Sequence, residues 1–563
     1  MTPGSVSRFR LYVLLALFFL APKVAAQTGG GSPSSVPPAP FTRGVNLSSW
    51  FEVSSAGQIL VNRHSFEDFA SLKALGVDVV RLPINLHPMT SGSPDFSIDP
   101  LLLEFLDVAV DRAEKAGLYI ILDDHTFDPA VATEKDVEKI LHKVWTQLAA
   151  RYRDRSDRVI YEILNEPHGI KPSVWAAIQG RVLKTIRGID SRHWIIVGGA
   201  NFNSYSELSA LPEYADDRLI YTFHFYDPFI FTHQGAGWTD PPLTNLSGVP
   251  FPPGSGPLPA VPKDLKRTWV SGNVANYSRG GSPETVKNAI DVAYEFARKR
   301  KVPVFCGEMG VYIPNSSQPD RVRWFELVRA HLEGRGISWA LWDCFGTFGM
   351  FEPGAGKSFA SDLDVGVTAA LGLTAPAQTA RRPRVVSGPV VLYDDAPADG
   401  AWYNGHVGPK GSANLYERNA ARGDYSIRLA DLDRYNHVGF RFPTPLDLSA
   451  LAREGYELRF FAKTTARDAR FDVRFLNPDE GPGDMPWRMS ATVDPARLPP
   501  DGKWHLVRIP LSEMFVTGAW KGAWFPDDNK SFDWRRVARF EFATEHHSFD
   551  GMEFFLDQIE LAR

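Results

Sequence analysis

The sequence predicts an α/β protein, a closed (β/α)8 TIM barrel followed by an all-β sandwich of the jelly-roll kind. Two observations predict it. From about residue 41 to 373, eight β-rich runs are mostly separated by helical runs, whereas from 390 to 563 only strand-like runs remain. Eight βα units in one stretch are typical of a closed barrel. The alternative is an open doubly wound sheet, but no glycine-rich phosphate loop follows the first strand, which argues against its nucleotide-binding form.

The barrel strands are expected to be nearly continuous apolar runs, as parallel strands buried on both faces are. They are RGVNLSS (43–49), VDVVRLPI (77–84), LYIILDDH (118–125), RVIYEILNE (158–166), HWIIVGG (193–199), RLIYTFHFY (218–226), KVPVFCGE (301–308) and GISWALWD (336–343). Asp99-Pro100 and Ser282-Pro283 each predict a helix start, a capping residue followed by proline at the first helical position. The longest loop, about 227–281, is expected to shape the functional site, with a neutral surface insertion as the alternative.

The second half of the chain changes texture after a Pro/Ala/Arg-rich stretch, 374–389, which is typical of a linker. Five strand-like runs then follow at 456–464, 469–477, 503–511, 536–544 and 552–561, several with alternation of apolar and polar residues. Turn residues separate them, so residues 390–563 are predicted to form a jelly-roll-like sandwich.

The N-terminus has the pattern of a secretory signal peptide. Two arginines, Arg8 and Arg10, precede an apolar run from Leu11 to Leu20, and small residues follow before 27. We therefore expect a signal peptide over 1–26, a flexible Gly/Ser/Pro-rich leader over 27–40, and a secreted, extracellular or periplasmic protein without a membrane partner after signal removal. The alternative is a retained lipid or membrane anchor.

Charge and cysteine content exclude several function classes. The formal net charge of −5 on 563 residues gives no reason to expect a nucleic acid as partner. The two cysteines, Cys306 and Cys344, are predicted to remain unpaired because their expected strand positions lie too far apart for a disulfide. No HExxH or CxxC motif occurs, so no metal is expected in the active centre.

Polar side chains close six of the expected barrel strands. In chain order they are Arg81, His125, Asn165 with Glu166, His224 with Tyr226, Glu308, and Trp342. Because the carboxyl ends of barrel strands meet at one rim, where active sites are built, these side chains are predicted to lie together. Asp123 and Asp124 are interpreted as structural, and Glu162 is assigned no role.

Two glutamates across a barrel mouth fit the cleavage of a glycosidic bond. One carboxyl group protonates the leaving oxygen and the other attacks the anomeric carbon, so their environments must differ. Arg81 is expected to hold Glu308 ionised and Tyr226 to orient it, while His224 is expected to bond Glu166. For the sugar itself, Asn165 is the expected partner of the 2-hydroxyl, His125 lines the glycone side, and Trp342 is a stacking floor.

The runs VVRLPI, ILDDH, YEILNEP, YTFHFYDP, VFCGEMG and ALWD, in that order, resemble glycoside hydrolase family 5 over about 41–373. The resemblance implies a retaining β-glycosidase in which Glu166 is the acid/base and Glu308 the nucleophile. The other stations of the family match at Arg81, His125, Asn165, His224, Tyr226 and Trp342. The implied activity is endo-β-1,4-glucanase on a β-glucan. The alternatives are β-mannanase, β-1,3-glucanase, xyloglucanase or, from another class, a non-catalytic polysaccharide-binding protein.

The sandwich resembles jelly-roll carbohydrate-binding modules through its opening VLYDD and closing FFLDQIEL. That resemblance implies sugar platforms among Trp402, Tyr403, Trp487, Trp520 and Trp524, with a domain that only packs on the barrel as the alternative. It also implies a structural calcium held by Asp394, Asp395 and Asp557. The active centre is expected to need no cofactor, and the protein is expected to be a monomer.

Overall fold

The computed structural model describes residues 36–126, 128–354, 356–479, 485–520, 523–526 and 531–563. By its contacts the chain divides into Met1–Ser35 and Val36–Arg563. The predicted signal peptide and most of the leader lie outside the described residues. Within these residues, no helix combines the length and the apolar character that a membrane crossing requires.

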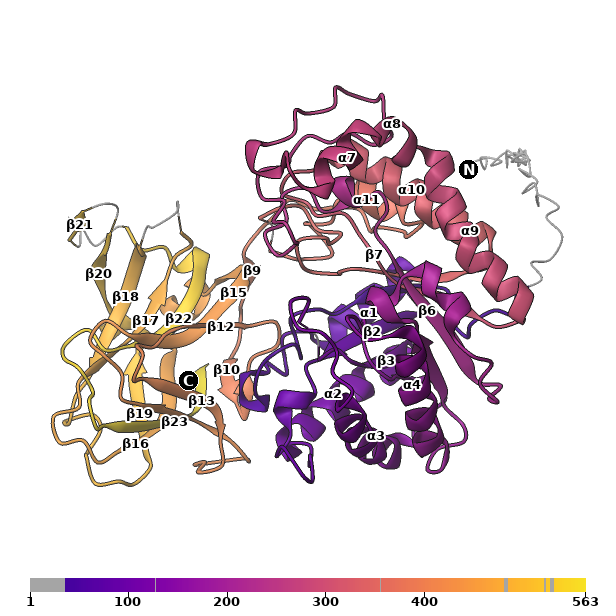
Figure 1. The fold of residues 1–563 in the computed structure, drawn as a ribbon. Helices are drawn as coiled ribbons and strands as arrows, with labels where there is room; N and C mark the ends of the chain where they lie inside the picture. The colour runs from indigo at the N-terminus through magenta and orange to yellow at the C-terminus, as the bar shows by residue number, and fades with distance from the viewer. Residues whose placement is uncertain (1–35, 127, 355, 480–484, 521–522, 527–530) are drawn as a thin grey trace, which may run out of the picture. The chain divides into compact units, whose positions relative to one another are not determined.

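The first half of the described chain is a closed barrel of eight parallel strands, which confirms the predicted fold class (Figure 1). Each strand pairs with the next in the chain, and β8 pairs with β1 to close the barrel. The strands are β1 (Arg43–Asn46), β2 (Val79–Ile84), β3 (Tyr119–Asp124), β4 (Val159–Glu162), β5 (Trp194–Gly198), β6 (Leu219–Phe225), β7 (Val304–Met309) and β8 (Ser338–Leu341).

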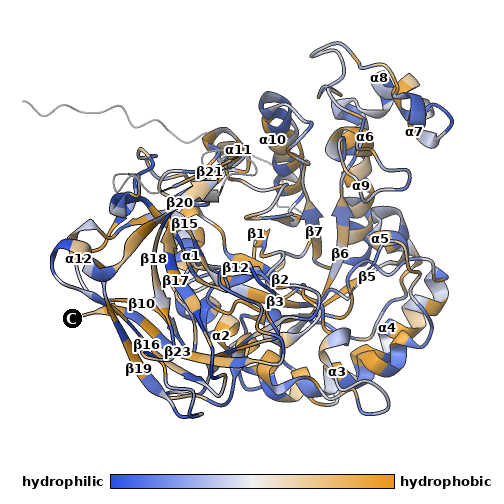
Figure 2. Ribbon diagram, turned by 90° about the vertical axis from the view of Figure 1, so that its left-hand side faces the viewer, coloured by the Kyte–Doolittle hydropathy of each residue, from blue (hydrophilic) through white to orange (hydrophobic). Residues whose placement is uncertain are grey.

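Helices surround the barrel strands, as Figure 2 shows. They are α1 (Phe66–Leu75), α2 (Pro100–Ala116), α3 (Val137–Tyr152), α4 (Pro172–Arg187), α5 (Ala200–Asn203), α6 (Phe229–Thr232), α7 (Trp269–Ala275), α8 (Tyr277–Gly280), α9 (Pro283–Arg300), α10 (Gln318–Gly334) and α11 (Val365–Ala370). The two predicted helix starts are confirmed, because the side chain of Asp99 accepts a hydrogen bond from Leu101 N and that of Ser282 accepts one from Thr285 N. In both helices a proline follows the cap.

The barrel interior is built in layers of opposite character. A lower apolar layer takes one residue from each of seven strands and adds a preceding phenylalanine: Phe41, Val79, Ile121, Ile160, Ile196, Ile220, Phe305 and Ala340. Side chains two residues apart point to the same face of a strand. The next inward positions of β2, β3 and β4 are therefore Arg81, Asp123 and Glu162, all buried. Charged side chains thus lie directly above an apolar plug.

Two strands end at other residues than expected, and this changes where Glu166 and Arg81 lie. β4 ends at Glu162, so Glu166 is in the turn beyond the strand, with φ of 44°. The expectation that the second strand ends near Arg81 is wrong, because β2 continues to Ile84. Arg81 is therefore inside the barrel, below the rim.

The second half forms two sheets whose strands pair antiparallel except at β9, which confirms the all-β domain. One contains β10 (Val390–Asp394), β11 (Ala396–Pro397), β13 (Ser412–Glu417), β14 (Ser426–Ala430), β16 (Glu457–Thr464), β19 (His505–Pro510) and β23 (Glu553–Ala562). The other contains β9 (Arg384–Val385), β12 (Trp402–His406), β15 (His437–Asp447), β17 (Phe471–Leu476), β18 (Met485–Val493), β20 (Phe515–Trp520), β21 (Trp524–Phe525) and β22 (Val537–Ala543), and α12 (Ser449–Arg453) follows β15. Phe460 of the first sheet contacts Phe542 of the second, with ring centroids 5.5 Å apart, so the two sheets pack face to face.

The stretch 374–389, interpreted as a linker, makes contacts at both of its ends. Thr374 N donates to Leu75 O over 2.9 Å, which ties the beginning to the barrel. Near the other end, Arg384–Val385 pairs in parallel with β15, so these residues belong to the sandwich sheet.

Gly44 is the point of closest approach at the barrel seam between β8, β1 and β2. A Cβ there would lie 2.7 Å from Val79 Cγ1 and 3.1 Å from the Ala340 Cβ. Gly44→Ala should therefore lower the free energy of unfolding by about 1–3 kcal/mol, the usual cost of overpacking. Urea denaturation followed by tryptophan fluorescence measures it.

The matched control is Gly334→Ala at the end of α10, where a Cβ would meet nothing within 4 Å. That variant should be neutral or slightly more stable, because alanine favours helix over glycine. Equal stability changes in the two variants would contradict the seam argument.

Candidate active site

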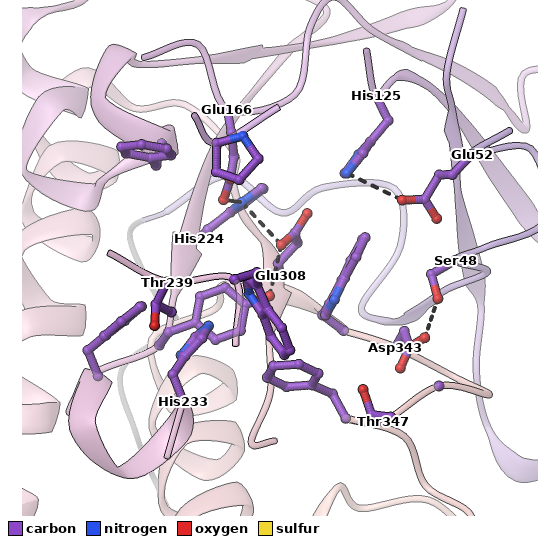
Figure 3. Close-up of a pocket in the computed structure, with 18 of the residues that line it drawn as sticks. Ser48, Glu52, His125, Glu166, His224, His233, Thr239, Glu308, Asp343 and Thr347 are labelled. Carbon is purple, nitrogen blue, oxygen red and sulfur yellow. Dashed lines mark hydrogen bonds and ion pairs between the residues drawn. The ribbon is translucent and has the colours of Figure 1, made fainter. Parts of the chain in front are cut away.

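A cavity of about 1500 Å³ opens at the carboxyl ends of the barrel strands (Figure 3). The segments after β1, β2, β3, β4, β5, β6 and β8 contribute to its wall, and β7 contributes Glu308 from within the strand. Six of the eight residues predicted from strand ends line it directly: His125, Glu166, His224, Tyr226, Glu308 and Trp342. Arg81 and Asn165 lie beneath them and act through hydrogen bonds.

Arg81 is the cation on which the site is built. Its side chain is completely buried and forms ion pairs with Asp123 at 2.9 Å, Glu162 at 2.7 Å and Glu308 at 3.0 Å. Burial alone would lower the pKa of Arg81, but the charges of these three carboxylates outweigh it and raise that pKa. The guanidinium stays charged and fixes the direction of every group that accepts from it.

Glu308 is held in one orientation by two donors. Arg81 Nη1 donates to Glu308 Oε1 over 3.0 Å, and the hydroxyl of Tyr226 donates to Oε2 over 2.8 Å. Both donors stabilise the carboxylate anion of Glu308. Arg81 contributes a positive charge and a hydrogen bond, and Tyr226 contributes a second hydrogen bond. Glu308 is the fifth residue of β7, so its backbone is held by the barrel itself.

Glu166 has the opposite environment. It lies in the rim turn after β4, and burial raises the pKa of its carboxyl to about 7. His224 Nδ1 lies 2.6 Å from Glu166 Oε1 and 3.5 Å from Glu308 Oε2. Burial lowers the pKa of His224 to about 4, so its ring is neutral near pH 7. Glu166 is therefore able to carry a proton where Glu308 carries a charge.

The remaining predicted residues, Asn165, His125 and Trp342, lie beside the groups just described. Asn165 Oδ1 accepts from Arg81 Nη2 over 2.8 Å, and its Nδ2 lies 3.4 Å from His125 Nε2. His125 in turn contacts Asp123 through Nδ1 at 2.7 Å, and its ring is stacked on Trp342 with centroids 5.3 Å apart. The structure thus brings all eight predicted residues into one hydrogen-bonded and stacked assembly.

Some functional residues were missed. Glu162, assigned no role, receives two hydrogen bonds from Arg81, and Asp123 links Arg81 to His125. The sequence signal that could have found them is their position, two residues after the inward-facing Ile121 on β3 and Ile160 on β4. Glu52 and Asp343 also line the cavity. Figure 3 shows both on the side opposite Glu166, and burial raises the pKa of each.

The long loop after β6 does reach the cavity, as expected. Trp238 lines it and is half exposed, whereas Trp269 donates its indole N–H to Asp240 O over 3.0 Å. His168 lines a separate hollow, and its Nδ1 lies 3.0 Å from Glu166 O. Cys306 and Cys344 are both buried thiols, so the prediction that they do not pair is confirmed.

Ligand atoms suited to a metal come together within the described residues at Glu166, His224 and Glu308, all within 4.8 Å of one another. The Arg81 guanidinium already supplies a positive charge there. In the sandwich, Asp395 Oδ1 accepts from the backbone N–H groups of Asp424 and Tyr425, and Asp557 Oδ2 accepts from those of Ala421 and Arg422. Two of the three carboxylates predicted to hold calcium, Asp395 and Asp557, therefore accept hydrogen bonds from the backbone.

Comparison with known proteins shows what the barrel is similar to. Residues 41–346, more than half of the chain, match the family described as Cellulase (glycosyl hydrolase family 5). Endoglucanase C of Acetivibrio thermocellus is 28% identical over 317 residues, 54% of this chain and 91% of that protein. Endoglucanase 3 of Fibrobacter succinogenes is 28% identical over 338 residues, 56% of this chain and 51% of that protein, so the match spans about half of that relative. Among solved structures, a hyperthermophilic endo-β-1,4-glucanase in complex with substrate matches 59% of this chain and 97% of its own, at 28% identity and a TM-score of 0.50.

Replacing Arg81 by Met should destabilise the barrel strongly, by about 3–5 kcal/mol at pH 7, because three buried carboxylates lose their cation. Burial already raises the pKa values of Asp123 and Glu162, and loss of the Arg81 charge that opposes burial should raise them further above their unfolded values. The folded variant then binds more protons than the unfolded chain, so its stability should recover as the pH falls from 8 to 5. Guanidinium denaturation at several pH values measures this.

The matched control is Arg181→Met, which removes a half-exposed ion pair with Glu138. It should cost less than about 1 kcal/mol at any of these pH values. An Arg81→Met variant as stable as this control would contradict the role of Arg81.

Proposed function

Since the chain belongs to glycosyl hydrolase family 5, we propose that it hydrolyses β-1,4-glucan internally by double displacement, with retention at the anomeric carbon. Glu166 is the general acid/base and Glu308 the nucleophile. The observation that carries this proposal is the pair of glutamates with opposite environments and with oxygens within 4.8 Å. That spacing suits the roughly 5–5.5 Å of a retaining pair rather than the roughly 6.5–9.5 Å of an inverting one.

In the first step, a Glu308 oxygen attacks the anomeric carbon while Glu166 donates its proton to the leaving oxygen. The glycosidic bond breaks, and a covalent glycosyl–enzyme ester forms on Glu308. In the second step, the Glu166 carboxylate takes a proton from water, the water oxygen attacks the anomeric carbon, and Glu308 leaves as a carboxylate. His224, neutral and 2.6 Å from Glu166, fixes the direction of that carboxyl group.

The substrate class rests on the cavity and the relatives. A cavity of about 1500 Å³ has room for several sugar units, and the similar proteins above are named endoglucanases. In this proposal Trp342 is the stacking floor for the sugar that is cleaved, His125 lines the cavity beside it, and Asn165 bonds the 2-hydroxyl from beneath. A mannan, a β-1,3-glucan or xyloglucan as substrate would keep the same chemistry and change only the sugar contacts.

The proposal extends to the chain around the site. We propose that residues 1–26 direct export, that the mature protein acts outside the cytoplasm as a monomer on polysaccharide, and that the active centre needs no cofactor. Calcium at Asp394, Asp395 and Asp557 stays a prediction. It is tested by thermal unfolding of the full chain with calcium and with a chelator.

Glu166→Gln and Glu308→Gln should each abolish most of the release of reducing ends from carboxymethylcellulose, mixed-linkage β-glucan, glucomannan, mannan, xyloglucan and laminarin, whichever the protein cuts. The loss for Glu166→Gln should be about 10²–10⁴-fold. A dinitrophenyl β-cellobioside separates the two roles, because its leaving group departs without a proton. Glu166→Gln should still release a burst of dinitrophenol, whereas Glu308→Gln should not.

Activity on mannan alone would overturn the substrate assignment but not the mechanism. Polysaccharide binding without cleavage by the wild-type protein would replace the enzyme by a binding protein. A burst from Glu308→Gln and none from Glu166→Gln would reverse the roles of the two glutamates.

The pH dependence follows from Glu166. Its carboxyl must be protonated for the first step, and its pKa is raised to about 7. The value of kcat/KM on a cello-oligosaccharide should therefore fall as the pH rises through about 7, with one proton lost. Retained activity at pH 9, or a basic limb near the ordinary glutamate pKa, would exclude Glu166 as the acid in this environment.

A further inference from the structure

The loop between β1 and α1 forms one wall of the cavity. Ser48, Ser49 and Glu52, near the β1 end of the loop, line the cavity. Figure 3 shows Glu52 across the cavity from Glu166, the acid that must touch the leaving group. This wall therefore faces the sugar that remains on Glu308 after the bond breaks.

The other end of the same loop is held by the sandwich. The hydroxyl of Tyr416, on β13, donates to Ile59 O over 2.6 Å. Gly400 N donates to Asn62 O over 2.8 Å, and Asn62 Nδ2 donates to Pro397 O over 3.0 Å. One loop therefore joins the cavity wall to the second half of the chain.

Apolar packing fixes the sandwich beside this loop. Phe105 of α2 and Tyr416 are both buried, with ring centroids 4.7 Å apart. Buried apolar side chains of the barrel and of the sandwich belong to one continuous cluster. Because close-packed interiors yield little, the hydrogen bonds to the loop have a firm support.

Arg63 links the sandwich to the cavity wall. Its guanidinium lies over the ring of Trp402 on β12, with 5.6 Å between Cζ and the ring centroid. Its Nη1 donates to Ser49 O. Burial lowers the pKa of Arg63, and the charges of Asp343 and Glu52, which both line the cavity, oppose that effect. The cation thus lies between an aromatic face of the sandwich and the acids of the wall.

The ring of Trp402 matters because hydrogen bonds satisfy Arg63 only in part. Arg63 Nε is buried and has no acceptor among the residues that the structure describes. A cation in such a place is costly, and an aromatic face lowers that cost. Loss of the ring should therefore loosen Arg63 and the groups that it holds.

Ser49 is the point of the wall that depends on Arg63. Its φ is 57°, in the left-handed region, which a residue other than glycine keeps only where its surroundings fix it. The carbonyl of Ser49 accepts from Arg63, and its N–H donates to the Glu52 carboxylate. The neighbouring Ser48 hydroxyl donates to Asp343. A looser Arg63 therefore frees the turn that directs these side chains.

We propose that Trp402 of the sandwich, acting through Arg63, positions the cavity wall Ser48–Glu52 and so sets how tightly the retained sugar is bound. This proposal rests on the proposed function and deepens it. Trp402 is outside the set of described residues that line the cavity, so it is a positioning residue. The role differs from that of a sugar platform, which would act only on a polymer long enough to reach the sandwich.

The test uses dinitrophenyl β-cellobioside, whose two sugars fill only the retained side of the cavity. Trp402→Leu in the full chain keeps apolar bulk and removes the aromatic face. It should raise KM by about 2–10-fold, the range of one lost cation–π contact. The value of kcat should stay within about two-fold, because Arg81 still orients Glu308.

A double-mutant cycle shows whether Trp402 acts through Arg63. Arg63→Met should raise KM at least as much as Trp402→Leu does. Adding Trp402→Leu to Arg63→Met should then raise KM no further, because the ring has no cation left to hold. Trp402→Phe, which retains an aromatic face, should keep KM close to that of the wild type.

The matched control is Trp524→Leu. Trp524 is on β21 and Trp402 is on β12, at opposite edges of the same sheet. Arg488 lies over the Trp524 ring at 5.2 Å, a contact of the same kind. This variant should leave KM on the short substrate unchanged.

An unchanged KM in Trp402→Leu, with activity lost only on mixed-linkage β-glucan, would make Trp402 a sugar platform and overturn the positioning role. Additive effects in the double variant, or a fall in kcat alone, would overturn it as well. Arg63→Met tests the same link from the barrel, so an unchanged KM there would overturn the proposal even if Trp402→Leu did not fold. Wild-type protein that cuts neither substrate would instead overturn the proposed function.

Discussion

The buried guanidinium of Arg81 is the interaction on which the rest of the site depends. A charge in the interior of a barrel is costly unless it is paired and fully hydrogen-bonded. Here Asp123, Glu162 and Glu308 pair with it at 2.7–3.0 Å, and Asn46 and Asn165 accept its remaining N–H groups. Because the guanidinium is planar and rigid, it fixes the direction from which each acceptor receives its hydrogen bond. The orientation of Glu308 is thus set by the barrel core rather than by a loop.

The difference between the two glutamates follows from where each is placed relative to this charge. Glu308 is on β7 and touches Arg81, whereas Glu166 is in a turn beyond the end of β4 and touches a neutral histidine. Glu308 is therefore stabilised as an anion, whereas Glu166, four residues beyond the end of β4, is stabilised as an acid. Because β4 ends at Glu162, before the apolar run of the sequence ends, Glu166 lies in the turn at the rim.

The fold and most of the site were predictable because barrels have a strict geometry. Continuous apolar runs identified all eight strands, and polar residues at their ends identified His125, Glu166, His224, Tyr226, Glu308 and Trp342. Strand ends were less predictable, because the run RVIYEILNE remains apolar through a turn. Glu162 and Asp123 escaped because an inward charge within a strand is recognised only when its partner on another strand is known.

The layering of the barrel has a consequence for how such a protein can change over generations. Arg81 on β2 and the carboxylates that pair with it on β3, β4 and β7 lie above the apolar layer, while Trp238 and Glu52 belong to loops. A substitution in a loop leaves the buried charges paired, whereas a substitution in the hub leaves a charge uncompensated. We therefore expect substitutions to be tolerated more readily at the rim than among the buried charges beneath it. Substitutions in the loops can therefore change which sugars are bound while the groups that break the bond stay in place.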